Sequence, residues 1–370
     1  MPPRFEGPPS HAEQEIASQP ECWRRAIELA GRPCPGLPAT DERVAVLGCG
    51  TSLHIARTYA TLREAAGHGE TDAWPASQFP ATRRYDRVLA LTRTGTTTEV
   101  LHALALVPAG VPVTAVTADQ DTPVARAAGT VVALGFADER SVVQTRFPTT
   151  ALMLLRAHLA GARTGSATTN PGPAAVLPGP PAPDPAGVGS AGVGSAGVGP
   201  AGVGSAGVGP AGVGPAGVGS AAVDSAGAGV AGLAELPAAA ELALYAALPA
   251  AGLTARQLVF LGSGWAAGIA GEAALKVREA AQSWAESYPA MEYRHGPIAV
   301  ADAGTLVWIF GRPPSGLVAE IRATAAAVEV TTADPMVDLV RVQRLAVRLA
   351  TARGLDPDRP RNLTRSIILH

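Results

Sequence analysis

The chain has few aromatic residues, a single lysine and no excess of charge of either sign. Aromatic residues make up 4% and hydrophobic residues 47% of its 370 residues, so its cores must be built mainly from alanine, valine and leucine. The 29 Lys and Arg residues nearly balance the 31 Asp and Glu residues, which gives a net charge of −2. A near-neutral chain without a basic run lacks the charge pattern of a nucleic-acid-binding protein. We therefore expect no nucleic-acid partner.

Features of membrane, secreted and metal-binding proteins are also missing. The apolar stretches are interrupted well before the roughly 18 residues that a membrane span needs. The first residues, MPPRFEGPPSHAEQEI, contain no apolar segment of the kind found in secretory signals. Cys22, Cys34 and Cys49 lack C-x-x-C spacing, and their odd number favours reduced thiols. No cluster of His, Asp and Glu has metal-ligand spacing. These absences predict a cytoplasmic protein without membrane association and without a metal.

A low-complexity tract divides the sequence. Residues 186–220 are seven consecutive copies of AGVG followed by Ser or Pro, and the flanking residues are also rich in Gly, Pro, Ala and Ser. Glycine makes ordering costly, and one valine per repeat buries too little surface to offset that cost. An elastin-like structural role is the alternative, but folded-looking sequence lies on both sides. We therefore predict a disordered linker over 164–232.

The sequence on both sides of this tract alternates between strands and helices. Before it, short β-branched runs predict strands, and apolar residues at helical spacing predict helices between them. The predicted strands are 43–48, 86–92, 112–118 and 130–135, with helices at 52–67, 99–107 and 147–160. After the tract, strands are predicted at 257–262 and 305–310, with helices at 265–281 and 337–354. This alternation predicts an α/β protein with two doubly wound parallel-sheet halves.

Two strand-to-helix turns in the first half carry polar groups suited to an anion. The turn LGCGTS includes Gly50, Thr51 and Ser52, whose backbone N–H groups and hydroxyls lie at a helix start. The turn LTRTGTTTE places six hydroxyl or guanidinium side chains around one glycine before the next helix: Thr92, Arg93, Thr94, Thr96, Thr97 and Thr98. Such donors suit a phosphate dianion, and both turns are expected at the same edge of the sheet. The alternative is that these residues only form tight turns and cap helices.

A third glycine turn, GSGWAAG at 262–268, lacks the G-x-G-x-x-G spacing of dinucleotide-binding proteins. Neither nicotinamide binding nor any other organic cofactor is expected from it.

The helix that follows this turn carries acid and base groups on one face. Glu272, Lys276 and Glu279 are spaced four and three residues apart, and His295 follows in a loop ended by Gly296. A base, an acid and a cation near the ligand end of a sheet are what an enolising sugar isomerase needs. The alternative is a surface helix with ordinary Glu–Lys pairing, in which His295 is a plain loop residue.

Several long segments resemble the sugar isomerase (SIS) family, and within it the isomerase domain of glutamine–fructose-6-phosphate aminotransferases. They are EQEIASQPECWRRAI (13–27), the turns at 49–52 and 92–97, DERSVVQTRFPTT (138–150), EAALKVREAAQSWAESYPAMEYRHGP (272–297) and LDPDRPRNLTRSIILH (355–370). The resemblance implies an N-terminal helix segment over 1–40, a first SIS domain over 41–163, a shortened second one over 233–354, and a tail over 355–370 that closes the sugar site.

The resemblance also implies roles for individual residues. By position, Glu279 moves a proton between C1 and C2 of the sugar, and His295 opens the ring from the partner subunit of a homodimer. Lys276 lies beside the base, and Glu272 is a carboxylate upstream on the helix. Ser52, Thr92, Arg93, Thr94 and Thr97 match the phosphate-binding turns, and Val142 and Gln144 match positions that line the sugar pocket. The implied partner is a phosphorylated sugar.

Three departures from the family pattern qualify these expectations. No glutaminase domain is recognised, so no glutamine amidotransferase activity is expected. Arg365 stands where the family has an imine-forming lysine, and guanidinium forms no imine although it can bind a substrate oxygen. Residues 311–336 are short for a region where the family has at least one more strand–helix pair, so the loss of such a pair is expected. The predicted activity is aldose–ketose isomerisation coupled to deamination of an amino sugar phosphate such as glucosamine 6-phosphate. The alternative is a non-catalytic phosphosugar-binding or regulatory protein.

Overall fold

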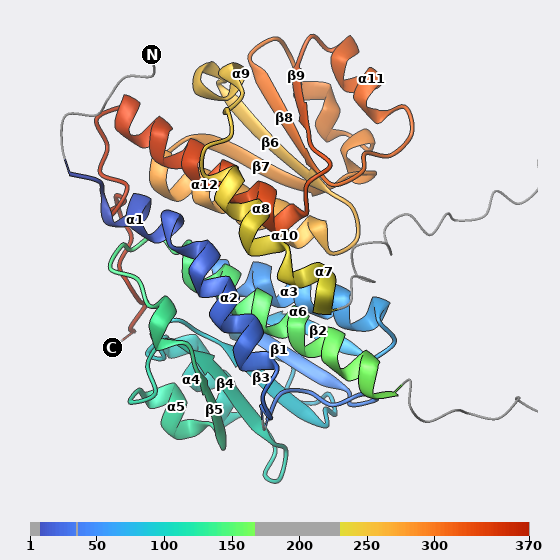
Figure 1. The fold of residues 1–370 in the computed structure, drawn as a ribbon, viewed down its shortest axis with the longest axis vertical. Coiled ribbons are helices and arrows are strands. Elements are labelled where there is room, and N and C mark those ends of the chain that lie inside the picture. The colour runs from blue at the N-terminus through green and yellow to red at the C-terminus, as the bar shows by residue number, and fades with distance from the viewer. Residues whose placement is uncertain (1–7, 35, 167–229, 370) are drawn as a thin grey trace, which may run out of the picture. The chain divides into compact units, whose positions relative to one another are not determined.

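The structure, a computed structural model, describes residues 8–34, 36–166 and 230–369. Figure 1 shows two parallel sheets with helices packed on them, which confirms the predicted α/β class. Residues 167–229, which contain the pentapeptide tract and most of the predicted linker 164–232, lie outside the described residues. Within the described part of the chain, no helix is long and apolar enough to span a membrane.

The first sheet has the strand order β2-β1-β3-β4-β5, and all its neighbouring strands are parallel. The chain moves outward from β1 to β2 on one side and continues through β3 on the other, so the order reverses between β1 and β3. Ligands of open α/β sheets bind at the carboxyl ends of strands at such a reversal. The strands are β1 (Val44–Gly48), β2 (Thr71–Pro75), β3 (Arg87–Leu91), β4 (Val113–Thr117) and β5 (Thr130–Ala133). The helices are α3 (Thr51–Ala65), α4 (Thr98–Ala105), α5 (Pro123–Ala127) and α6 (Arg146–Ser166), with short 3₁₀ turns η1 (Ala76–Gln78) and η2 (Gly135–Ala137).

The second sheet has the order β7-β6-β8-β9, again parallel. Its strands are β6 (Gln257–Gly262), β7 (Trp284–Pro289), β8 (Thr305–Phe310) and β9 (Ala327–Val330). The helices are α9 (Ala250–Thr254), α10 (Ala266–Ala281), α11 (Leu317–Ala323) and α12 (Pro335–Ala352), with 3₁₀ turns η3 (Glu292–Arg294) and η4 (Pro297–Val300). Residues 311–336, which were expected to have lost a strand–helix pair, in fact contain α11 and β9, so that expectation was wrong. Gly316, whose backbone has a positive φ of +78°, precedes α11 soon after β8 ends. A short helix and a short strand therefore fit before α12.

The two halves are joined by contacts of the N-terminal helices with helices of both halves. The N-terminal helices are α1 (His11–Ala17) and α2 (Gln19–Ala30), and α7 (Val230–Ala234) and α8 (Leu236–Ala243) precede the second sheet. Helix α2 packs against α6 and α8, and α1 packs against α12. The buried Trp23 of α2 donates its indole N–H to Thr149 Oγ1 of α6 at 3.0 Å. One core therefore continues from the first half into the second.

Helices α3 and α10 approach closely because two glycines of α10 face α3. A Cβ atom on Gly268 would lie 2.2 Å from Thr58 Oγ1, and one on Gly271 would lie 2.4 Å from the His54 ring. Because any side chain would force the helices apart, these glycines allow the start of α3 to contact the later residues of α10, where Lys276 meets Thr51. This contact brings residues of the two halves together.

Candidate functional site

The glycine turn between β1 and α3 is built for close backbone packing. Gly50 has φ +54°, a left-handed conformation that favours glycine. A Cβ atom on Gly48 would lie 2.5 Å from the backbone of Ser52. Thr51 and Ser52 therefore begin α3 directly at the end of the sheet, and both are buried. Their backbone N–H groups lie at the positive end of the helix dipole, as the sequence predicted.

The threonine turn, residues 92–98, lies at the end of β3 beside the glycine turn. Gly95 has φ +61°, and a Cβ atom there would lie 2.1 Å from Thr122 Oγ1. Its backbone N–H donates to Thr92 Oγ1 at 3.2 Å, which fixes the start of the turn. The hydroxyls of Thr94, Thr96 and Thr97 gather at one place, where they meet a serine of the C-terminal tail. The sequence had grouped these threonines correctly, but gave no sign of what they contact.

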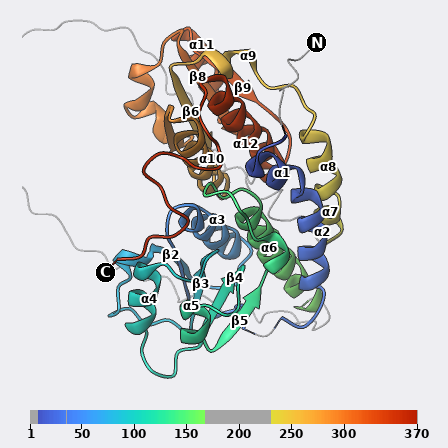
Figure 2. The ribbon, with the colours of Figure 1, turned by 90° about the vertical axis from the view of Figure 1, so that its left-hand side faces the viewer.

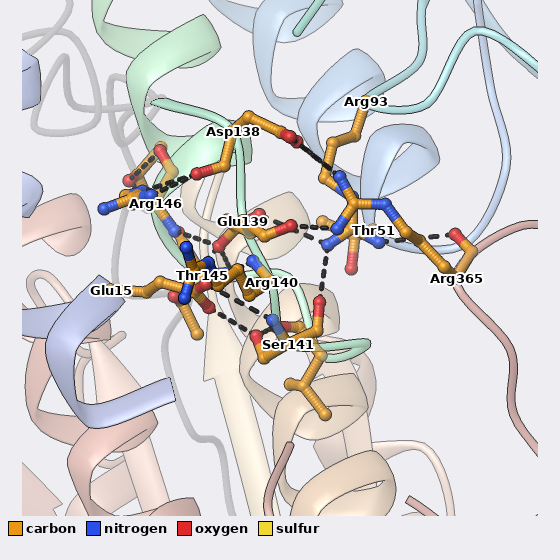
Figure 3. Close-up of polar contacts among 12 residues, drawn as sticks. Glu15, Thr51, Arg93, Asp138, Glu139, Arg140, Ser141, Thr145, Arg146 and Arg365 are labelled. Atoms are coloured by element: carbon orange, nitrogen blue, oxygen red, sulfur yellow. Dashed lines mark hydrogen bonds and ion pairs between the residues drawn. The ribbon is translucent and has the colours of Figure 1, made fainter. Parts of the chain in front are cut away.

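Arg93 has an unexpected environment. Its buried guanidinium donates to the backbone oxygen of Ser141 at 2.9 Å and to that of Arg365 at 3.3 Å. Its Nη1 also lies 3.6 Å from a carboxylate oxygen of Glu139 (Figure 3). Arg93 thus connects the threonine turn to the segment 138–145 and to the tail. The guanidinium is therefore engaged by protein groups, and it positions the threonine turn, the 138–145 segment and the tail relative to one another.

Glu139, which sequence reasoning had not singled out, is the buried partner of Arg93. Burial raises the pKa of Glu139, while the Arg93 charge opposes that rise. Its Oε1 accepts from the backbone N–H groups of Thr145 and Arg146, at 2.5 and 2.7 Å. Among the described residues, Arg93 Nε and Glu139 Oε2 have no hydrogen-bond partner. In the sequence, only its place in the 138–150 segment pointed to Glu139. Nothing in the sequence showed that this acidic residue is buried and not exposed.

The segment 138–145 carries the two residues expected to line a sugar pocket. Val142 donates its backbone N–H to the backbone oxygen of Asp358 at 2.9 Å, and its side chain is half-buried. Gln144 is also half-buried, and its Oε1 atom is buried without a hydrogen-bond partner among the described residues. An unpartnered amide oxygen can accept a hydrogen bond from a ligand hydroxyl.

A carboxylate–lysine cluster of Thr51, Glu272, Lys276 and Glu279 lies where α3 meets α10. Lys276 Nζ is 2.6 Å from Glu279 Oε2, 2.8 Å from Thr51 Oγ1 and 3.4 Å from Glu272 Oε1. The predicted shared face of the helix is therefore present, and it meets the glycine turn of the other half. Lys276 and Glu272 are fully buried, so the alternative of a surface Glu–Lys pair is wrong.

The cluster has an uneven charge distribution. Burial raises the pKa of Glu272 to about 7, against the opposing charge of Lys276. Burial also disfavours the Lys276 ammonium, but the Glu272 and Glu279 carboxylates outweigh it and raise the pKa of Lys276. The short contact joins Lys276 to Glu279, whereas Glu272 is farther away. The arrangement therefore has a charged Lys276–Glu279 pair and a glutamic acid that changes protonation near neutrality.

His295 lies apart from this cluster, on the exposed loop between η3 and η4. Within the described residues, no hydrogen bond or ion pair joins it to Glu279. Met291 and Val300, on either side of it in sequence, are large hydrophobic residues that are 50% and 64% exposed. A role for His295 in the site of its own subunit is thus not indicated by its contacts, and a plain loop residue remains the alternative.

Arg365 is paired within the chain. Its guanidinium forms two hydrogen bonds with the Asp138 carboxylate, at 2.7 and 2.9 Å, and another with the Glu139 backbone oxygen (Figure 3). Arg365 and Asp138 line a cavity of about 430 Å³ at the threonine turn, together with Arg93, Thr94, Asp119 and Ser366. Within residues 8–34, 36–166 and 230–369, no group of three His, Cys, Asp or Glu side chains could hold a metal ion.

No protein-family model matches the chain. In sequence it is 35% identical to the isomerizing glutamine–fructose-6-phosphate aminotransferase of Pyrobaculum aerophilum, over 29% of this chain and 23% of that protein. The chain thus spans about a quarter of the length of the curated relatives it matches. In structure it is similar to a glucosamine-6-phosphate deaminase of Thermotoga maritima, with TM-score 0.68 and 21% identity over 97% of this chain and 100% of that one. The fold is that of the SIS family.

A second SIS structure gives the same result. The C-terminal domain of the glucosamine-fructose-6-phosphate aminotransferase of Francisella tularensis has TM-score 0.67 and 16% identity, over 97% of this chain and 100% of that domain. Both solved SIS proteins match nearly the whole chain, so the likeness includes both sheets. At these identities the match establishes the SIS fold, while the resemblance of the site residues rests on their positions in the sequence.

Proposed function

We propose that this chain is a phosphosugar isomerase of the SIS type, acting on an amino sugar phosphate. The observation that carries the proposal is the contact between Thr51 of the first half and Lys276 of the second. Through it Glu279, the proposed proton carrier, comes to the same edge of the first sheet as two turns that suit a phosphate. An isolated helix cap or a surface ion pair does not require this convergence of two halves.

In the proposed mechanism the glycine and threonine turns hold the phosphate. Ser52, Thr92, Thr94 and Thr97 supply hydroxyls, and the starts of α3 and α4 supply backbone N–H groups and a favourable dipole. Gly50 and Thr51 complete the glycine turn. Val142 and Gln144 border the sugar, and Arg93 keeps their segment in place. Phosphate binding orients the substrate so that its reacting carbons lie near Glu279.

Glu279 is the proposed proton carrier. With glucosamine 6-phosphate in its open form, Glu279 takes the C2 proton, and the electrons form an enolamine between C1 and C2. The same carboxyl returns the proton to C1, which leaves an imine at C2. Water then adds to C2 and ammonia leaves, so the products are fructose 6-phosphate and ammonia. Lys276 stabilises the Glu279 carboxylate, and Glu272 balances the charge of the cluster.

His295 is proposed to act from the partner subunit of a homodimer, where it assists opening of the sugar ring. The exposed position of its loop, with Met291 and Val300 nearby, supports a contact with a second copy. Light scattering tests this: a dimer is expected at working concentration, and a monomer with full activity would contradict it.

A second candidate function is phosphosugar binding without turnover. The observation that favours it is the engagement of Arg365 by Asp138, at the position where an imine-forming lysine is expected. Such a protein would bind sugar phosphates to report their level and would not need Glu279.

One assay separates the two functions. Ammonia and fructose 6-phosphate released from glucosamine 6-phosphate are measured by coupled enzymes, for the unaltered chain, Glu279→Gln and Glu28→Gln. Glu28 lies on the exposed side of α2 and controls for the loss of one negative charge. Release that disappears only in Glu279→Gln supports the isomerase. No release from any form, with sugar phosphates still raising the melting temperature, supports the binding protein.

A further inference from the structure

The C-terminal tail lies on the threonine turn. Figures 1 and 2 both show the last described residues running beside α4. Ser366 Oγ lies 3.3 Å from Thr94 Oγ1, 2.9 Å from Thr96 Oγ1 and 3.4 Å from Thr97 Oγ1. Three hydroxyls that the sequence assigns to a phosphate are thus turned toward one hydroxyl of the chain itself.

The tail also occupies the start of α4. The backbone N–H of Thr98 donates to the backbone oxygen of Ile367 at 3.1 Å. The backbone N–H of Leu369 donates to Thr98 Oγ1 at 2.9 Å. The first N–H groups of a helix lack partners within the helix and favour an anion. Here a neutral carbonyl oxygen takes that place.

The tail is fixed by polar groups and buries little apolar surface. Ile367, Ile368 and Leu369 are 47%, 55% and 62% exposed. The charged contacts are those of Arg365 with Asp138, while Arg93 donates to the Arg365 backbone oxygen. Polar contacts that are open to water exchange readily for other polar contacts. A phosphate dianion forms stronger hydrogen bonds with the same donors than a hydroxyl or a carbonyl does.

We propose that residues 365–369 are an internal competitor for the phosphate site, held in place by the Arg365–Asp138 pair. The proposal rests on the proposed function, because it assumes that the threonine turn binds phosphate monoesters. A phosphate monoester can occupy the turn only after Ser366 and the Ile367 carbonyl have left it. Only molecules in which the tail is displaced can bind phosphate. The apparent affinity of the chain for phosphate is therefore the affinity of the uncovered turn multiplied by the fraction of such molecules.

The decisive variant is Arg365→Gln in the full chain, with inorganic phosphate as the probe in titration calorimetry. If Arg365 were a phosphate ligand, removing its charge would weaken binding. If it holds the tail down, its removal strengthens binding, by roughly threefold to tenfold. Ser366→Ala, which changes no charge, is expected to strengthen binding as well. Leu363→Ala lies in the same tail outside these contacts and is expected to bind like the unaltered chain.

A second measurement follows the tail directly. Trypsin cleaves after arginine, so cleavage between Arg365 and Ser366, followed by mass spectrometry, reports the displaced tail. Phosphate is expected to speed this cleavage in the unaltered chain, while chloride at equal ionic strength is not.

The outcomes separate the two proposals. Stronger phosphate binding by Arg365→Gln and Ser366→Ala, together with faster cleavage, supports the competitor. Phosphate binding that is unchanged or weaker in both variants overturns it and leaves the phosphate site standing. If neither the unaltered chain nor any variant binds inorganic phosphate or glucosamine 6-phosphate, the phosphate site itself is wrong, and the competitor falls with it.

Discussion

Replacing Glu272 by glutamine should remove a pH dependence of stability that this one carboxyl causes. Burial raises the pKa of Glu272 from its ordinary value of 4.5 to about 7 in the folded protein. Between these values the folded chain holds a proton that the unfolded chain has lost. Stability contributed by this proton is therefore fully present below pH 4.5 and is lost as the pH rises through 7. Each pKa unit corresponds to about 1.4 kcal/mol, so the whole change amounts to about 3 kcal/mol.

Glutamine resembles the protonated form at every pH. We expect Glu272→Gln and the unaltered chain to have similar free energies of unfolding near pH 5. At pH 8 the ionised Glu272 lowers the stability of the unaltered chain, so the variant should be more stable relative to it by about 3 kcal/mol. Urea unfolding at pH 5, 6, 7 and 8 measures this difference. Glu28→Gln serves as the control for the loss of one acidic group at an exposed position.

The cause of the effect is the position of Glu272 in the cluster. Its Oε1 lies 3.4 Å from Lys276 Nζ, farther than the Glu279 oxygen at 2.6 Å. Its other oxygen is buried without a hydrogen-bond partner among the described residues. If the stability difference between Glu272→Gln and the unaltered chain is the same at pH 5 and pH 8, Glu272 does not titrate in this range. The assignment of Lys276 and Glu279 as the charged pair would then be wrong.

Three further substitutions test the site. Thr51→Val should lower stability by about 1–3 kcal/mol in urea unfolding, because Lys276 loses a buried acceptor; an unchanged midpoint would contradict the contact between the halves. Gly95→Ala should destabilise the chain by about 1–3 kcal/mol and weaken phosphate binding, because its positive φ and the nearby Thr122 oppose a side chain; normal binding by calorimetry would contradict the fixed turn. Arg93→Gln should weaken sugar-phosphate binding about tenfold, since the 138–145 segment, which carries Val142 and Gln144, loses the donor that holds it at the threonine turn; binding as strong as in the unaltered chain would show that Arg93 does not position this segment.

The central strands could be predicted from sequence, whereas three edge strands could not. Strands β1, β3, β6 and β8 are buried on both faces, so they read as short continuous apolar runs. Strands β2, β7 and β9 lie at sheet edges and are only partly buried. Their sequences TDAWP, WAESYP and AVEV are short and mostly mix polar with apolar residues, so they look like loops. The missed α11 and β9 also explain why residues 311–336 were judged too short.

The site shows a similar division. The spacing of Glu272, Lys276 and Glu279 predicted a shared face, because helix geometry alone determines it. Sequence could not show that this face meets Thr51, because that contact depends on Gly268 and Gly271 allowing two helices to pack closely. Nor could it pair Arg365 with Asp138, which are far apart along the chain and meet only when the tail folds back.

The most direct test of the account is deuterium exchange on the substrate carbons. Fructose 6-phosphate and ammonium, which together form the C2 imine of the proposed mechanism, are incubated in deuterated water with the unaltered chain or with Glu279→Gln, and NMR follows the C1 protons. A carboxyl that moves a proton between C1 and C2 must exchange it with solvent in some turnovers. We predict incorporation of deuterium at C1 by the unaltered chain and none above background by Glu279→Gln. If sugar phosphates bind but neither form exchanges the C1 protons, the proton transfer assigned to Glu279 is contradicted.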